Sequence, residues 1–148
     1  MATDMKPPAA AADFLKHHGW DDAQILPVAG DASFRRYFRV EAGDRKAILM
    51  DAPPPHEDPK PFIAIAEYLT KSGFAAPEIF ARDLTHGLVL LEDFGDRRMR
   101  EHLDDHPADE EAIYRQTIDL LQGLHRAPAA ALPAYDEQQY LREANLLT

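Results

Sequence analysis

The chain has 148 residues, of which 45% are hydrophobic, and this is enough for one packed domain. A formal charge of -10 at pH 7 repels phosphate backbones, so we expect no nucleic-acid partner. The absence of cysteine excludes disulfides, thiolate metal sites and cysteine nucleophiles. The first residues lack the basic-then-apolar order of a signal peptide, and no apolar run approaches the roughly 20 residues that span a bilayer. We therefore expect a cytoplasmic protein without a membrane partner.

The amino-terminal half predicts a short helix followed by an antiparallel meander. Residues 9–18 are rich in alanine, and Gly19 is placed to end a helix there. Residues 25–28 are apolar and residues 34–40 alternate between two faces, with a glycine-containing turn between them. A third strand pattern, residues 46–51, follows a turn in which Gly43 is free to adopt positive φ.

A proline-rich loop and an amphipathic helix come next. Residues 53–61 contain five prolines, and their missing N–H groups exclude a central strand or a helix interior. Apolar residues at helical spacing then predict a helix over 62–72. Two more apolar runs, 79–81 and 87–91, predict the fourth and fifth strands. We predict one five-stranded antiparallel sheet with the helix packed on one face.

Beyond Gly95 the sequence predicts only helices and their connectors. The strongest helix has an apolar face and an acidic start, and its face comprises Ile113, Thr117, Leu120, Leu121 and Leu124. Asp136 is placed to cap a last helix that runs to Asn145. The predicted fold class is α+β, and the predicted segments are a short amino-terminal extension (1–22), a mixed unit (23–95) and a helical one (96–148).

Three local sequences carry a more specific resemblance. They are GDASFRRYFR at 30–39, ILMDAPP at 48–54 and LLEDFGD at 90–96. Together with the element order they resemble the aminoglycoside-phosphotransferase-like kinases, and within that family the bacterial anomeric kinases of N-acetylmuramate and N-acetylglucosamine. The resemblance runs from about Ile25 to the end. It implies that 23–95 form a protein-kinase-like amino-terminal lobe with its hinge, and that 96–148 begin the helical carboxy-terminal lobe.

The resemblance also implies where ATP would bind. Residues 30–36 would cover the phosphates, and residues 92–94 would form a hinge whose main-chain groups meet the adenine. The implied nucleotide-binding residues are Gly30, Asp31, Ala32, Ser33, Arg35, Arg36, Met50, Glu92, Asp93 and Phe94. Arg35 and Arg36 would supply cations to the phosphates, and Met50 a wall beside the base. Two alternatives stay open: residues 30–36 could be an ordinary hairpin turn, and the hinge could be a simple strand-to-helix connector.

The lysine–glutamate ion pair common in kinase lobes is not evident. Met50 occupies the position of the strand lysine, and Lys46 is interpreted as a solvated hairpin residue. Glu67 lies away from the apolar stripe of its helix and is interpreted as an exposed charge. The spacing of His102 and His106, next to Asp105, also suits a metal, but without a third convergent ligand we interpret it as a solvated helix face.

Catalysis in this family would need residues that we do not expect here. An aspartate of an H-x-D-type loop orients the attacking hydroxyl, and a downstream asparagine and aspartate hold Mg²⁺. The sequence holds no such loop with the required neighbours and placement. We therefore predict the nucleotide-binding portion of an ATP-dependent amino-sugar phosphotransferase, with no catalytic or metal-binding residue, whose Mg²⁺ and sugar substrate belong with the missing lobe. The alternative is a non-catalytic nucleotide- or partner-binding module. An uncovered apolar helix face would favour self-association.

Overall fold

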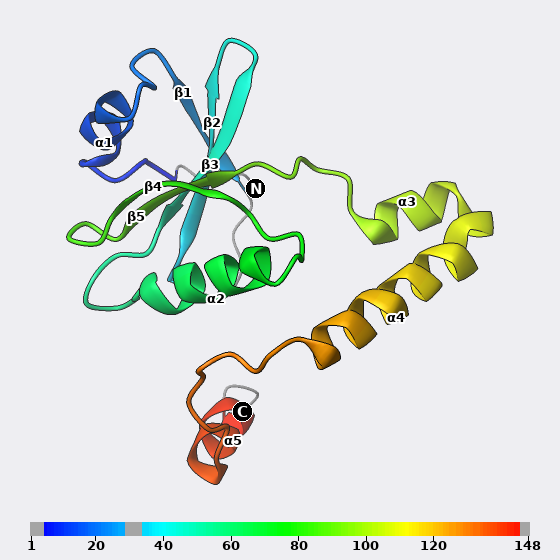
Figure 1. Ribbon diagram of the computed structural model, residues 1–148. Helices are drawn as coiled ribbons and strands as arrows, with labels where there is room; N and C mark the ends of the chain where they lie inside the picture. Colours follow the sequence, from blue (N-terminus) through cyan, green and yellow to red (C-terminus); the bar gives the residue numbers. More distant parts are fainter. Residues whose placement is uncertain (1–4, 29–33, 146–148) are drawn as a thin grey trace.

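A five-stranded antiparallel sheet forms the centre of the molecule (Figure 1). The computed structural model describes residues 5–28 and 34–145. The strands occur in the order β1-β2-β3-β5-β4 across the sheet, and every neighbouring pair is antiparallel. Their bounds are β1 Gln24–Val28, β2 Arg36–Ala42, β3 Arg45–Asp51, β4 Ile79–Asp83 and β5 Leu88–Glu92. The predicted sheet and the predicted α+β class are confirmed.

Five α-helices are found in the described part of the chain. They are α1 Ala11–His17, α2 Lys60–Lys71, α3 Met99–Asp105, α4 Glu110–Arg126 and α5 Glu137–Ala144, with a 3₁₀ turn at Pro107–Asp109. Pro61 lies in the first turn of α2, where its missing N–H breaks no helical hydrogen bond. The Asp136 side chain accepts a hydrogen bond from the Gln139 N–H at 2.9 Å, which confirms the predicted cap of α5. From residue 97 to 145 no strand occurs, as predicted.

Alternation along the strands buries both faces of the sheet. Phe38, Leu49 and Leu90 point to one face and pack with Phe14 and Leu15 of α1. The intervening residues point to the other face, where Met50, Ile63, Val89 and Leu91 form a second cluster under α2. The central strands β3 and β5 are therefore covered on both sides, which explains the unbroken apolar runs at 47–50 and 88–91.

The β4–β5 turn packs tightly against the end of β3. Gly87 has φ +71°, and a Cβ built on it would lie 1.9 Å from the Ala52 carbonyl oxygen. The Ala52 N–H donates to the Gly87 carbonyl at 2.8 Å. Only glycine fits this contact, because it combines positive φ with the absence of a side chain.

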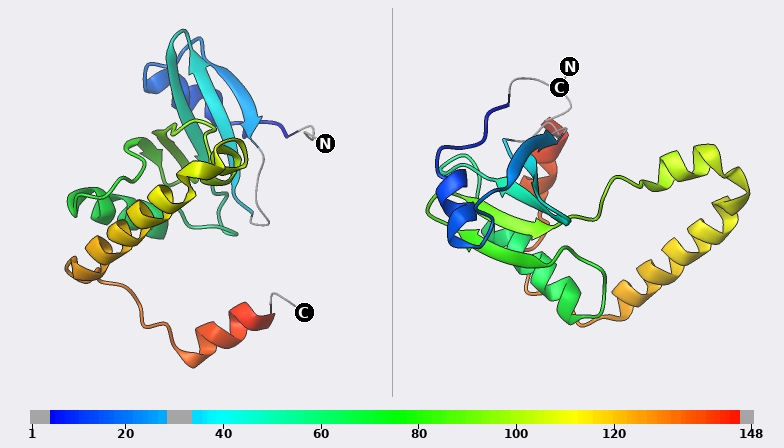
Figure 2. Two further views of the ribbon diagram at one scale, coloured as in Figure 1. Left: turned by 90° about the vertical axis from the view of Figure 1, so that its right-hand side faces the viewer. Right: turned by 90° about the horizontal axis from the view of Figure 1, so that it is seen from above.

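The helical segment leaves the sheet at residue 93 and returns to it near α2. Figure 2 shows α3 and α4 extending away from the sheet before the end of α4 approaches α2. The Tyr68 hydroxyl donates to the Pro128 carbonyl at 2.5 Å, and Gly123 faces the Phe74 ring. Between these two ends the apolar side of α4 is uncovered: Ile118, Leu120 and Leu121 are more than half exposed. Across the described residues, no helix has the length and apolarity needed to cross a membrane.

Candidate functional site

The predicted phosphate-binding segment is described only from Phe34 onward. Gly30, Asp31, Ala32 and Ser33 lie outside the described residues. The Arg35 Nε donates to the Glu57 carboxylate at 3.0 Å, and the Phe34 ring stacks on His56 at 5.5 Å between centroids. Burial lowers the pKa of Arg35, but hydrogen bonding and the charge of Glu57 more than offset this, so the pKa lies above its ordinary value. The proline-rich loop thus contacts the start of β2.

Arg36 lies on the other side of the sheet. Its Nε and Nη2 donate to one Asp51 carboxylate oxygen at 2.8 and 2.5 Å, and the Asp51 residue is 1% exposed. Its guanidinium also lies 5.9 Å from the Phe38 ring centroid, on the α1 face. Arg35, in contrast, borders a cavity of about 340 Å³ with Phe62, Ile65 and Leu69 on the α2 side. The two predicted phosphate cations are therefore on opposite faces of the sheet.

The strand-lysine position contains no charge. Met50 is fully buried in the cluster under α2. Lys46 is exposed and contacts Glu41 at 2.9 Å, so the interpretation of Lys46 as a solvated hairpin residue is confirmed. Glu67 contacts Arg82 of β4 at 3.1 Å with both side chains more than half exposed, which confirms that Glu67 is a surface charge. Lys46 and Glu67 thus pair with Glu41 and Arg82 rather than with each other as in a kinase ion pair.

The predicted hinge follows β5 and is held in shape by its own polar groups. The Glu92 N–H donates to the Glu78 carbonyl at 2.9 Å, and the Glu78 N–H donates back to the Glu92 carboxylate at 3.2 Å. The Asp93 side chain is 6% exposed and accepts from the Gly95 N–H at 2.7 Å. Phe94 points outward and is 61% exposed. Gly95 has φ +74°, which completes a tight turn after the strand.

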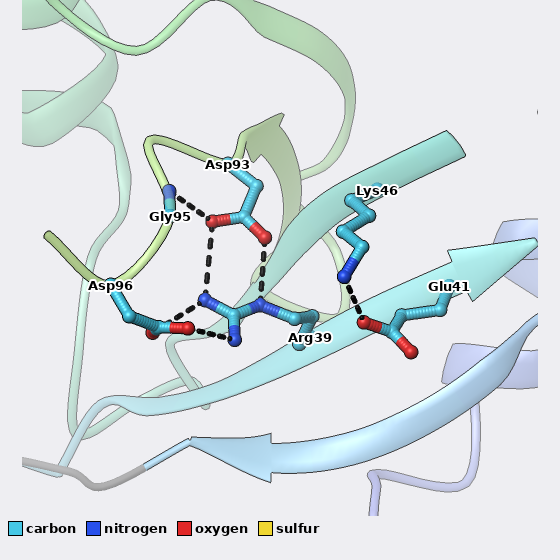
Figure 3. Close-up of polar contacts among 6 residues, drawn as sticks. All are labelled: Arg39, Glu41, Lys46, Asp93, Gly95 and Asp96. Carbon is cyan, nitrogen blue, oxygen red and sulfur yellow. Dashed lines mark hydrogen bonds and ion pairs between the residues drawn. The ribbon is translucent and has the colours of Figure 1, made fainter. Parts of the chain in front are cut away.

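Arg39 of β2 fixes this turn from across the sheet (Figure 3). Its Nε and Nη2 donate to the two Asp93 carboxylate oxygens at 2.7 and 3.3 Å. Its Nη1 and Nη2 donate to the two Asp96 oxygens at 2.8 Å each. The hydrogen bonds raise the pKa of Arg39, and the hydrogen bond from Arg39 lowers the pKa of Asp96 below its ordinary value.

The sequence reasoning missed the role of Arg39. The sequence indicated Arg39 only as one position in an alternating strand, Asp93 as a hinge residue through its main chain, and Asp96 as a turn former. The register places Arg39 opposite Ile48 of β3, and Ile48 opposite Leu91 of β5, so Arg39 faces the strand end that leads into the hinge. The interacting residues are 54 and 57 positions apart in the sequence, and no local pattern joins them.

The pattern H-x-D occurs twice in the sequence, at 56–58 and 102–104. Whether either occurrence could be the catalytic loop depends on the residues around it. Asp58 accepts from the Lys60 N–H at 3.0 Å, in the loop that leads into α2. His102 contacts the Asp109 carboxylate at 2.8 Å and stacks on His106, at the solvated surface of α3. The kinase pattern has asparagine five positions after the aspartate, where this chain has Ile63 and Asp109. In the described residues, no three potential ligands converge on a metal position.

Residues 24–148 match the phosphotransferase enzyme family, and the chain belongs to that family. It is 41% identical over 132 residues to the N-acetylmuramate/N-acetylglucosamine kinase of Pseudomonas aeruginosa, covering 86% of this chain and 38% of that protein. The kinases of the same name from Pseudomonas putida and Caulobacter vibrioides are 35% and 33% identical over 138 and 155 residues, covering 90% and 86% of this chain. The matches span 40% and 42% of those two proteins, so this chain corresponds to about two fifths of the length of its curated relatives.

Proposed function

We propose that the chain is the nucleotide-binding portion of an ATP-dependent kinase of small amino sugars. The observation that carries the proposal is the turn after β5, which Asp93 and Arg39 hold in one conformation at the predicted hinge. Two comparisons support it: the family match over residues 24–148 and the relatives named as N-acetylmuramate/N-acetylglucosamine kinases. In this proposal residues 23–95 form the nucleotide-binding lobe, residues 1–22 precede it, and residues 96–148 begin the helical lobe.

The nucleotide would lie on the α2 side of the sheet. Hinge recognition requires exposed peptide groups at a strand end rather than particular side chains. The Glu92 N–H is bonded to Glu78, so the Glu92 carbonyl and the peptide groups of Asp93 and Phe94 would meet the adenine edge. Arg35 is the better candidate for contact with phosphate, because it shares the face of Met50 and is part-buried near the predicted phosphate loop. Gly30, Asp31, Ala32 and Ser33 remain predicted phosphate-loop residues.

Arg36 remains a prediction from sequence with a competing structural role. Its guanidinium is already bound to Asp51 on the α1 face. A substitution of Arg36 would therefore change the stability of the sheet as well as any contact with phosphate. Arg35 is also paired, with Glu57, but that carboxylate is 17% exposed against 2% for Asp51, so removing Arg35 leaves a less buried charge.

Nucleotide binding is the first test of the proposal. We expect NMR titration of the ¹⁵N-labelled chain with ADP and Mg²⁺ to shift the amide signals of residues 92–95. Arg35→Ala should weaken ADP binding by about ten- to a hundredfold, because a charge-assisted hydrogen bond contributes about 1.5–3 kcal/mol. Arg82→Ala serves as the matched control, since it removes an exposed cation of the same sheet that is paired with Glu67 and lies opposite Val89, away from the hinge, and its dissociation constant should equal that of the wild type. Unperturbed hinge amides at saturating ADP would contradict the proposal.

Phosphoryl transfer separates the kinase portion from the non-catalytic module. Positioning and charge stabilisation provide most of the catalysis in this reaction, so we expect no measurable turnover of N-acetylmuramate or N-acetylglucosamine by a chain that ends at Thr148. The coding sequence after Thr148 distinguishes the hypothesis of a kinase portion from that of a non-catalytic module. An H-x-D loop with a following asparagine would support the kinase, and an immediate stop codon would support the module.

A further inference from the structure

Arg39 holds together two hinge carboxylates that would otherwise repel each other. Both Asp93 and Asp96 accept from the same nitrogen, Nη2, so the two negative groups lie against one another around one guanidinium. Four of the five N–H groups of Arg39 are used in this way. Two like charges at such proximity are stable only with a cation between them. Arg39 is therefore the residue that permits the turn at 93–96 to close.

The Asp93 side chain is committed to this arrangement. One of its oxygens also accepts from the Gly95 N–H, and the side chain is 6% exposed. It therefore turns back into the protein, while the neighbouring Phe94 points outward. What residues 92–94 present to the cleft depends on the main-chain conformation that this side chain fixes.

We propose that Arg39 is a positioning residue for the nucleotide base. It keeps residues 93–96 in the one conformation in which the hinge main chain receives adenine, and it does so without touching the ligand. This inference rests on the proposed function. Without Arg39 the turn samples open conformations, and the apparent dissociation constant rises by the inverse of the fraction that stays closed.

The test compares two ligands that share a base. The wild type, Arg39→Ala, Arg39→Lys and the control Arg82→Ala are titrated with adenosine and with ADP, and Gly95 amide hydrogen exchange is measured in each. We expect Arg39→Ala to raise both dissociation constants by the same factor, roughly tenfold if about a tenth of the molecules keep the closed turn. The Gly95 amide should exchange faster by the ratio of the open fractions of the variant and the wild type, which exceeds the change in the dissociation constant when the wild type is almost always closed. Arg39→Lys should give an intermediate loss, because a lysine cannot bind two carboxylates bidentately.

Each outcome has a distinct meaning. If the wild type binds neither ligand, the proposed function fails. If the wild type binds and Arg39→Ala binds equally well, the positioning role is overturned while the proposed function stands. A loss for ADP but not for adenosine would place Arg39 at the phosphates and also overturn it.

A second variant covers the case in which Arg39→Ala does not fold. Asp96→Asn removes one charge from a side chain that is 80% exposed, so the sheet is not disturbed. It should still accelerate Gly95 exchange and raise the dissociation constants for adenosine and ADP by one common, smaller factor. Unchanged exchange and unchanged binding in Asp96→Asn would overturn the inference.

Discussion

At the scale of single residues, ion pairs of this chain differ in how far water reaches them. The Asp51 carboxylate is almost completely buried beside Arg36, whereas Lys46 and Glu41 form their pair at the surface. An exposed pair contributes little to stability, because water and salt screen it. A buried carboxylate that loses its partner retains the full cost of desolvation. Removing Arg36 should therefore cost more stability than removing Lys46.

Arg36→Ala should destabilise the protein by about 2 kcal/mol, since it leaves the buried Asp51 charge unpaired. The urea midpoint, followed by the fluorescence of the single tryptophan, Trp20, measures this loss. The double substitution Arg36→Met with Asp51→Leu should recover much of it, because an apolar pair needs no counter-charge. Equal midpoints for the wild type and Arg36→Ala would show that Asp51 is not held by this contact.

At the scale of elements, the β4–β5 turn depends on one glycine. Gly87→Ala should lower the free energy of unfolding by about 3 kcal/mol, because the added methyl group meets the Ala52 carbonyl and the residue must keep positive φ. Gly43→Ala is the matched control: Gly43 has φ +60° with open space around it, so only the backbone strain of about 1–2 kcal/mol applies. Denaturant unfolding of both variants measures the difference. Equal losses would mean that the Ala52 contact moves aside without cost.

The elements were largely predictable, and their spatial order was not. The alternation in 34–40 and the apolar periodicity in 62–69 predicted β2 and α2, because both signals are local. Nothing local indicates that β5, rather than β4, pairs with β3, since this depends on how the chain crosses the sheet. The same limit applies to the site: the hinge is a prediction from a local sequence and stays a prediction, whereas the contact of Arg39 with Asp93 became visible only in the fold.

At the scale of the whole molecule, the described segment that contains α3 and α4 contacts the sheet and α2 near its two ends only. It begins at the turn fixed by Arg39 and ends where Tyr68 bonds to Pro128 (Figure 2). The apolar residues between these points face no part of the described chain closely enough to be buried. Such a face is a site for association.

We expect the 148-residue chain to self-associate through α4. Sedimentation velocity over a concentration series should show a rising sedimentation coefficient for the wild type. Leu121→Gln, at a residue that is 57% exposed, should shift the curve toward the monomer, whereas the neighbouring change Gln122→Ala should leave it unchanged. A wild type that stays monomeric near millimolar concentration would contradict the expectation, since an association weaker than about 4 kcal/mol has no practical weight.

The two outer strands bear on how such association would occur. An edge strand usually offers a row of free peptide groups to which another chain can add a strand. Here β1 contains Pro27, which has no N–H to donate, and the pairing of β4 with β5 is irregular between Ile79 and Ala81. Both edges of the sheet are therefore poor templates for strand addition and for amyloid-like growth. Copies of this chain that meet would do so through helix side chains, in assemblies that dilution reverses.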